Sequence, residues 1–225
     1  MLWSPNCQLL YPFENQANDY SGNARHGTVS GSGVYATKPN GGRCLYFDGT
    51  GDYVATPSFG LSGTVVVFAC WIRRAQHTVI QTYIGDAGQS VTLGYIFCYS
   101  DANANNLKWK YAHGTNYASA TSDTYFNPPY NDAWLHLCVV CDYAGKNCYF
   151  YRNGLAIGSP VAMVGTPAFP STARVKYIGG YGVNVYLLTY GYMANVQLWT
   201  LATMPPAGQM LANVNRLMLG MNPIW

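Results

Sequence analysis

Two stretches near the amino terminus decide the fold of this chain: DYSGNARHGTVSG, Asp19–Gly31, and YFDGTGDYVATP, Tyr46–Pro57. The first is a polar loop of Asp, Ser, Asn and Gly residues. The second is rich in aromatic and β-branched residues, which suit a strand, and it also contains glycine and aspartate residues typical of a turn. A polar loop that leads into a short strand of this kind indicates a β protein.

The composition supports the same fold class. The 225 residues include 24 glycines, 12 prolines and 20 tyrosines, and only 9% are charged, against about 25% in an average soluble domain. This mixture fits short strands joined by many turns, and a β-sandwich of this length can form one domain. The net charge of +3 is scattered and forms no basic stripe, so we expect no nucleic-acid partner. No apolar run is long enough to predict a membrane span.

Apolar runs between Gly, Asp and Asn clusters predict the individual strands. VVVFACWI, Val65–Ile72, is predicted to be a buried strand. Further strands are predicted at Val79–Ile84, Val91–Tyr99 and Leu107–Ala112.

A hairpin is predicted next. One face of its first strand should carry Leu135, Leu137, Val139 and Cys141, and the other face His136, Cys138 and Val140. A turn at Ala144–Asn147 then leads into the second strand, Cys148–Arg152.

The carboxyl-terminal segment has a helical period instead. Apolar residues recur at helical spacing at Met210, Leu211, Val214, Leu217 and Met218. Pro205 and Pro206 suit a helix start, because an N–H group there has no intrahelical partner, and Gly220 suits a helix end. We therefore expect a short helix and a docking tail at about 205–225.

Several segments, in order, resemble a laminin-G-like domain of the concanavalin A-like lectin and glucanase superfamily. Besides the two opening stretches, they are ACWI at Ala69–Ile72, AWLHLCVVCDYAGKNCYFYRNGLAIG at Ala133–Gly158 and YIGG at Tyr177–Gly180. The ending MNPIW, Met221–Trp225, is similar to the tail of members encoded by bacteriophages. The resemblance implies an all-β fold, an antiparallel two-sheet β-sandwich or jelly roll of about twelve strands with a short C-terminal helix. We expect residues 1–225 to form this single domain.

The seven cysteines are Cys7, Cys44, Cys70, Cys98, Cys138, Cys141 and Cys148. Their odd number and their positions in apolar runs predict reduced core cysteines rather than a disulfide framework. A zinc site made from His136 and the three last cysteines is not expected, because residues three apart on a strand point to opposite faces. The first residues show no basic n-region or apolar h-region, so no secretory signal is predicted.

The sequence argues against catalysis. Glu14 is the single glutamate, whereas glucanases of the superfamily share an E-x-D-x-x-E strand whose carboxylates flank the scissile bond. Asp48 and Asp52 lie in the segment that the resemblance assigns to structure. The histidines, His26, His77, His113 and His136, lack a nucleophile-elbow context.

The resemblance also implies a possible structural calcium ion between the polar loop and an acidic strand near the carboxyl terminus. The candidate ligands are Asp19, Asn23 and Asn195, with Ser21 and the main chain near His26. Ala194 and Asn195 replace both acidic residues of the family pattern, so we expect no metal and no other cofactor. Alternatively, Asp19 and Asn23 cap N–H groups of their own loop.

Two functions remain open. The first is a non-enzymatic virion structural protein, a phage capsid decoration or cement subunit that is made in the host cytoplasm and displayed on the virion surface. Its partners would be the major capsid or other virion proteins and copies of itself, as a dimer or trimer. The absent secretory signal, the reduced cysteines and the phage-like tail favour this prediction.

The alternative is an extracellular carbohydrate-binding lectin or adhesin module that recognises host-surface glycans. Its candidate ligand-binding residues are Asn105 and Asn106 in one polar loop, and His113, Asn116 and Tyr117 in another. The same composition also occurs in ordinary exposed turns. The abundant tyrosine fits both functions, because one rigid ring offers apolar area and a hydroxyl group.

Overall fold

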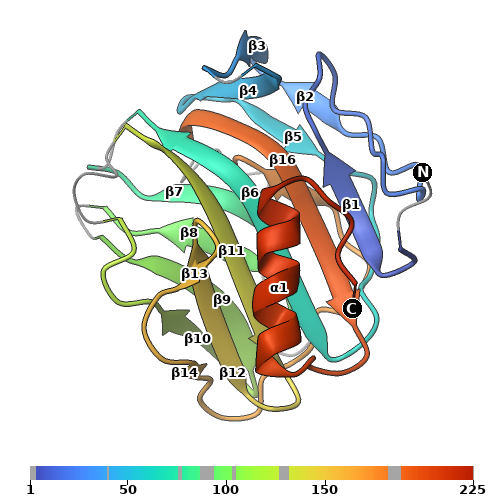
Figure 1. The fold of residues 1–225 in the computed structure, drawn as a ribbon, viewed down its shortest axis with the longest axis vertical. Helices are drawn as coiled ribbons and strands as arrows, with labels where there is room; N and C mark the ends of the chain where they lie inside the picture. Colours follow the sequence, from blue (N-terminus) through green and yellow to red (C-terminus); the bar gives the residue numbers. More distant parts are fainter. Residues whose placement is uncertain are drawn as a thin grey trace.

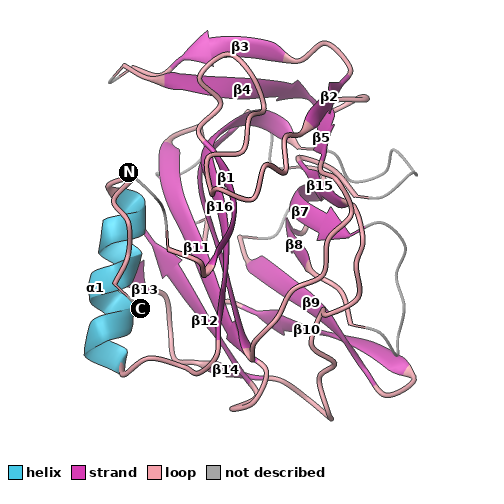
Figure 2. Ribbon diagram, turned by 90° about the vertical axis from the view of Figure 1, so that its right-hand side faces the viewer, coloured by secondary structure: helices cyan, strands magenta, loops and turns pink. Residues whose placement is uncertain are grey.

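The computed structural model describes residues 4–39, 41–75, 78–86, 94–102, 105–126, 132–181 and 189–224. Two antiparallel β-sheets pack face to face, and one helix, α1 (Ala207–Met218), lies against the outside of one of them (Figures 1 and 2). This arrangement confirms the predicted two-sheet sandwich with a short carboxyl-terminal helix. Nothing helical in the described ranges has the length and hydropathy that a membrane span requires.

The larger sheet has nine strands in the order β13–β12–β11–β6–β16–β4–β3, with β1 also paired to β16 and β14 to β12. The strand β16 organises this sheet, because its first half pairs with β4 and its second half with β1, on either side of a bulge after Ala194. The bounds are β1 Cys7–Tyr11, β3 Val34–Thr37, β4 Arg43–Asp48, β6 Val65–Arg74, β11 Trp134–Asp142, β12 Asn147–Arg152, β13 Leu155–Ala156, β14 Val161–Ala162 and β16 Tyr190–Leu201.

The smaller sheet has seven strands in the order β10–β9–β8–β7–β15–β5–β2. Their bounds are β2 Thr28–Ser30, β5 Tyr53–Ala55, β7 Gln81–Asp86, β8 Phe97–Ser100, β9 Leu107–His113, β10 Asn116–Thr121 and β15 Lys176–Ile178.

Two predicted strands have different bounds in the structure. The strand expected at Val79–Ile84 begins at Gln81, and of the one expected at Val91–Tyr99 only the part from Phe97 is strand, residues 91–93 lying outside the described residues. The described residues form sixteen strands rather than about twelve. The surplus consists of short pairings, such as the two-residue strands β13 and β14, which are too short to show an alternating pattern.

The core lies between the sheets, and a second apolar cluster lies under the helix. In β6, Val66, Phe68 and Cys70 face the main core, whereas Val65 and Val67 face the second cluster beneath α1. The strand is therefore buried on both faces, which explains its continuous apolar run. The hairpin prediction is confirmed in the same way: Leu135, Leu137, Val139 and Cys141 belong to the main core, and Cys138 and Val140 to the second cluster.

The helix docks through Met210, Val214 and Leu217, which are fully buried. Residues 219–224 then return along α1. Asn213 holds this tail at two points: its Nδ2 donates to the carbonyl of Ile224 at 2.8 Å, and the Ile224 N–H donates to its Oδ1 at 2.7 Å.

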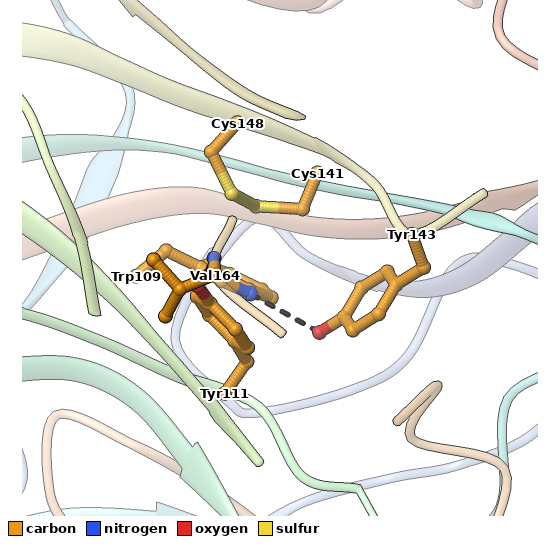
Figure 3. Close-up of a disulfide and its surroundings, with 6 residues drawn as sticks. All are labelled: Trp109, Tyr111, Cys141, Tyr143, Cys148 and Val164. Carbon is orange, nitrogen blue, oxygen red and sulfur yellow. Dashed lines mark hydrogen bonds between the residues drawn. A yellow bond between two sulfur atoms is a disulfide. The ribbon is translucent and has the colours of Figure 1, made fainter. Parts of the chain in front are cut away.

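One cysteine prediction is wrong. Cys141 and Cys148 form a disulfide in the main core, beside Trp109 and Tyr143 (Figure 3). The two residues are directly opposite each other on β11 and β12, with Cα atoms 4.3 Å apart, so their side chains meet on one face. The other five cysteines are free and buried. Cys138 lies on the opposite face from this pair, and no group of three or more metal-ligating side chains occurs within the described ranges.

Candidate functional site

The outer face of the seven-stranded sheet carries a cluster of aromatic rings and lysines, which we call the aromatic face. It comprises Tyr95, Phe97, Tyr99, Lys108, Lys110, Tyr117 and Tyr181. The cluster results from strand alternation. Ile96, just before β8, and Cys98 within it point into the main core, so Phe97 and Tyr99 point to the other side of the sheet, where Phe97 is buried under its neighbours; in β9, Trp109 points inward, so Lys108 and Lys110 point outward.

The rings of the aromatic face contact one another in two groups. Phe97 stacks on Tyr99 with centroids 4.6 Å apart and lies 4.6 Å from Tyr181. Tyr95 meets Tyr117 edge to face at 5.4 Å. Gly85, opposite Phe97 on β7, leaves room for this packing, because a Cβ atom there would come within 3.0 Å of the Tyr181 ring. The rings are therefore held in fixed positions before any ligand arrives.

The ammonium groups of two lysines lie over these rings. The Lys110 Nζ atom lies 4.9 Å from the centroid of Tyr117 and 5.9 Å from that of Phe97, which are cation–π distances. Burial lowers the pKa of Lys110 from its ordinary value. Lys108 lies 5.9 Å from the Tyr99 centroid and forms an ion pair with Asp101. The face thus combines rigid apolar rings with N–H and O–H groups, the mixture that small-ligand sites use for affinity and orientation.

The predicted loop residues fall into two separate places. His113, Asn116 and Tyr117 come together at the turn between β9 and β10, where His113 pairs with Asn116. Asn105 and Asn106 precede the other end of the seven-residue strand β9, roughly 20 Å away at the usual rise per residue. Of the five residues, the structure places Tyr117 in the aromatic face, 38% exposed.

The polar loop is closed by its own hydrogen bonds. The Asp19 carboxylate accepts four of them, from the N–H groups of Leu10, Ser21 and Arg25 and from the Ser21 hydroxyl, at 2.8–3.0 Å. Asn23 directs its Nδ2 group, a donor, to the carbonyl of Cys7 at 2.8 Å. A calcium ion needs free oxygen atoms, and here the carboxylate is already surrounded by N–H and O–H donors. The residues present therefore do not fit calcium.

Asn195, the third candidate calcium ligand, faces a different part of the molecule. It lies in the bulge of β16 with a φ of 48°, and its side chain lines a pocket beside the end of α1. Its Nδ2 atom is 3.8 Å from the position a Cβ would take on Gly220.

The sequence alone did not point to most of the aromatic face, namely Tyr95, Phe97, Tyr99, Tyr181, Lys108 and Lys110. A signal was present, because Asn106–Tyr111 alternates polar and apolar residues, as expected of a half-exposed strand. That pattern places Lys108 and Lys110 on the outer face, but the rings that meet them come from other strands.

A sandwich of two antiparallel sheets in this order has a concanavalin A-like architecture. The chain belongs to the concanavalin A-like lectin/glucanases superfamily, whose family model matches residues 48–206. No sequence among curated proteins matches the chain significantly.

Solved structures with the same fold cover nearly the whole chain. Domain 4 of a GH43 extracellular arabinanase from Geobacillus stearothermophilus, in complex with arabinotriose, has a TM-score of 0.73 at 17% identity and covers 95% of this chain and 98% of its own. The receptor binding domain of botulinum neurotoxin mosaic serotype C/D has a TM-score of 0.66 at 13% identity. The binding domain of Paraclostridial Mosquitocidal Protein 1 has a TM-score of 0.65 at 13% identity.

This chain spans about half of the two toxin domains, with 96% and 95% of it aligned to 51% and 52% of theirs. Identities this low show a shared fold and nothing finer.

Proposed function

We propose that this protein is a non-catalytic carbohydrate-binding module and that the aromatic face contacts the glycan. The observation that supports the proposal is the pair of outward tyrosine rings, Tyr99 and Tyr117, packed against buried aromatic rings and edged by Lys108 and Lys110. The same fold occurs in an arabinanase domain that was solved with arabinotriose, which makes a sugar the first ligand class to test.

The chemistry of the face suits a sugar. Sugar rings have one or two apolar C–H faces that pack on aromatic rings, and their hydroxyl groups need hydrogen-bond partners at the edge. Tyr99 and Tyr117 supply both ring and hydroxyl, and the lysine ammonium groups supply donors. Because the rings already contact each other, little side-chain entropy is lost on binding.

No catalytic step is part of the proposal. Hydrolysis of a glycosidic bond normally needs two carboxyl groups on either side of it. Asp101, which lies beside the aromatic face, is already held in its ion pair with Lys108.

The test is binding of the purified chain to immobilised and soluble glycans, arabinan oligosaccharides included, followed by isothermal titration. Tyr99→Ala and Tyr117→Ala should each weaken binding about tenfold or more, the usual cost of removing a ring at the centre of a contact. Tyr20→Ala is the matched control, because Tyr20 is 51% exposed in the polar loop and outside the aromatic face. Equal affinity of all three variants would overturn the assignment of the site.

The virion decoration subunit remains a prediction, together with its homo-oligomer and its virion-surface location. Native mass spectrometry and co-purification with particles test it separately. A protein that binds no glycan but is stoichiometric with a shell protein would replace the carbohydrate proposal.

A further inference from the structure

A second candidate site lies on the opposite side of the sandwich, on the outer face of the nine-stranded sheet. There a pocket of about 390 Å³ opens between the carboxyl-terminal end of α1 and the turn after β3. We call it the tryptophan pocket; it is lined by Lys38, Pro39, Trp71, Trp134, Asn195, Met218 and Leu219. It shares no residue with the aromatic face.

The two indole rings have different roles. Trp71 fixes the helix, since its Nε1 donates to the carbonyl of Met218 at 3.2 Å. Trp134 Nε1 is buried and has no hydrogen-bond partner among the described residues. A buried donor left unpaired costs about 1–3 kcal/mol. Because this nitrogen is buried, Trp134 contributes ring carbon atoms, not its donor, to the wall of the pocket.

Hydrogen bonds reduce the negative potential that the end of α1 presents to this pocket. Unpaired carbonyl groups normally make the carboxyl end of a helix negative. Here the last four are all satisfied: Asn215 by Leu219 N–H, Arg216 by Met221 N–H, Leu217 by Gly220 N–H, and Met218 by the Trp71 indole. The φ of 69° at Gly220 allows the closing turn.

The charges near the pocket are mainly positive. Lys38 lines it and is in none of the ion pairs of the described residues; the nearby Arg73 is paired with Asp132 at 3.0 Å. Burial raises the pKa of the neighbouring Cys44 thiol, and the cations Lys38, Arg43 and Arg73 oppose that rise. One negative group, the carboxylate of Glu14, lies near Lys38. Both groups are close to the position that a Cβ atom would take on Gly42, Lys38 Nζ at 3.4 Å and Glu14 Oε1 at 3.9 Å.

The polar groups of the pocket are mostly donors. Lys38 can only donate hydrogen bonds, and Asn195, set at the bulge with a φ of 48°, can donate and accept. None of the lining residues is a carboxylate. A ligand that fits needs an apolar ring face for the indoles and an acceptor-rich, negatively charged group for the donors.

We propose that the tryptophan pocket binds the carboxylate-bearing ring of an acidic sugar, a uronic or a sialic acid. The ring packs on an indole face, and the carboxylate accepts from Lys38 Nζ. Asn195 serves a hydroxyl group of the same ring. The site is independent of the aromatic face, so either can exist without the other.

Isothermal titration of the full chain with D-glucuronate, N-acetylneuraminate and D-glucose tests the proposal. At least one acidic sugar should bind more tightly than glucose by about tenfold, and added salt should weaken its binding. Trp134→Ala removes one indole wall of the pocket and should cost about tenfold or more in affinity. Lys38→Met should cost a similar factor and reduce the salt dependence.

One control variant makes the result specific. Lys146→Met removes an exposed lysine in the turn at the far end of β11 from Trp134. It should bind the acidic sugar as the unmodified chain does. The proposal is overturned if neither acid binds at about 10 mM, if glucose binds equally well, or if Trp134→Ala and Lys38→Met leave the affinity unchanged.

Discussion

Acid should destabilise this protein through one buried histidine. His136 on β11 is 1% exposed, its ring lies 5.5 Å from that of Trp71, and its Nδ1 atom has no partner among the described residues. Burial lowers the pKa of His136 from 6.5 to about 3. The folded protein therefore keeps this imidazole neutral where the unfolded chain has already taken up a proton.

The sign and size of the effect follow from linkage. A lowered pKa in the folded state gives stability that is present above the unfolded pKa of 6.5 and is lost as the pH falls toward about 3. Each unit of pH in that window costs about 1.36 kcal/mol. From about pH 7.5 to about pH 4.5 the loss is about 2.5 kcal/mol, a large part of the roughly 5–15 kcal/mol that holds a domain folded.

Urea unfolding at a series of pH values measures this loss. His136→Gln, which does not titrate, should remove most of the slope between about pH 6.5 and about pH 4.5, where carboxyl groups are still largely ionised. His113→Gln, which removes a half-buried histidine at the end of β9, is the matched control variant and is measured alongside. An unchanged slope in His136→Gln would refute the reasoning, whatever the variant's absolute stability.

Two further predictions concern the core. Lys176 Nζ and Asp86 Oδ1 form an ion pair at 2.9 Å with side chains 0% and 1% exposed, and burial lowers the pKa of Lys176 and raises that of Asp86. Lys176→Met should cost about 3–5 kcal/mol in urea unfolding, and adding Asp86→Leu should recover much of it; no recovery would contradict the pair's assignment. For the disulfide, thiol titration of the denatured, unreduced chain should find five free cysteines of seven, and seven would disprove it. Replacing Cys141 and Cys148 by alanine should lower the free energy of unfolding by about 2.5 kcal/mol.

The sequence predicts the strands well where burial imposes a long pattern. The run Val65–Ile72 and the alternation of Leu135–Cys141 both correspond to observed strands. Each buried face of a sheet requires apolar residues at every second position, and this pattern can be recognised in the sequence. Short edge pairings such as β13 leave no such mark. The disulfide depends on register: Cys141 and Cys148 meet only because Asp142 pairs with Asn147 at the end of the hairpin. The count and spacing of the cysteines along the chain could not show this.

The candidate sites were harder to predict than the fold for the same physical reason. Tyr117 could be named from its loop, but its partners Tyr95 and Lys110 come from other segments. The tryptophan pocket joins the turn after β3, the start of β11, the bulge of β16 and the end of α1. Trp71 and Trp134 were visible in the sequence as residues that match the family pattern. Nothing in that match indicates that a helix would close a pocket over them.

That helix links stability to the proposed second site. Because Trp71 donates to Met218, the same indole forms a wall of the pocket and holds the end of α1 on the sheet. A ligand that packs on this indole binds the state in which α1 is docked on the sheet. Ligand binding therefore stabilises the docked helix, and docking of the helix strengthens ligand binding by the same free energy. His136 lies against this tryptophan on the neighbouring strand. Protonation that loosens His136 should therefore weaken ligand binding in the tryptophan pocket before it affects the aromatic face, which lies across the core on the other sheet.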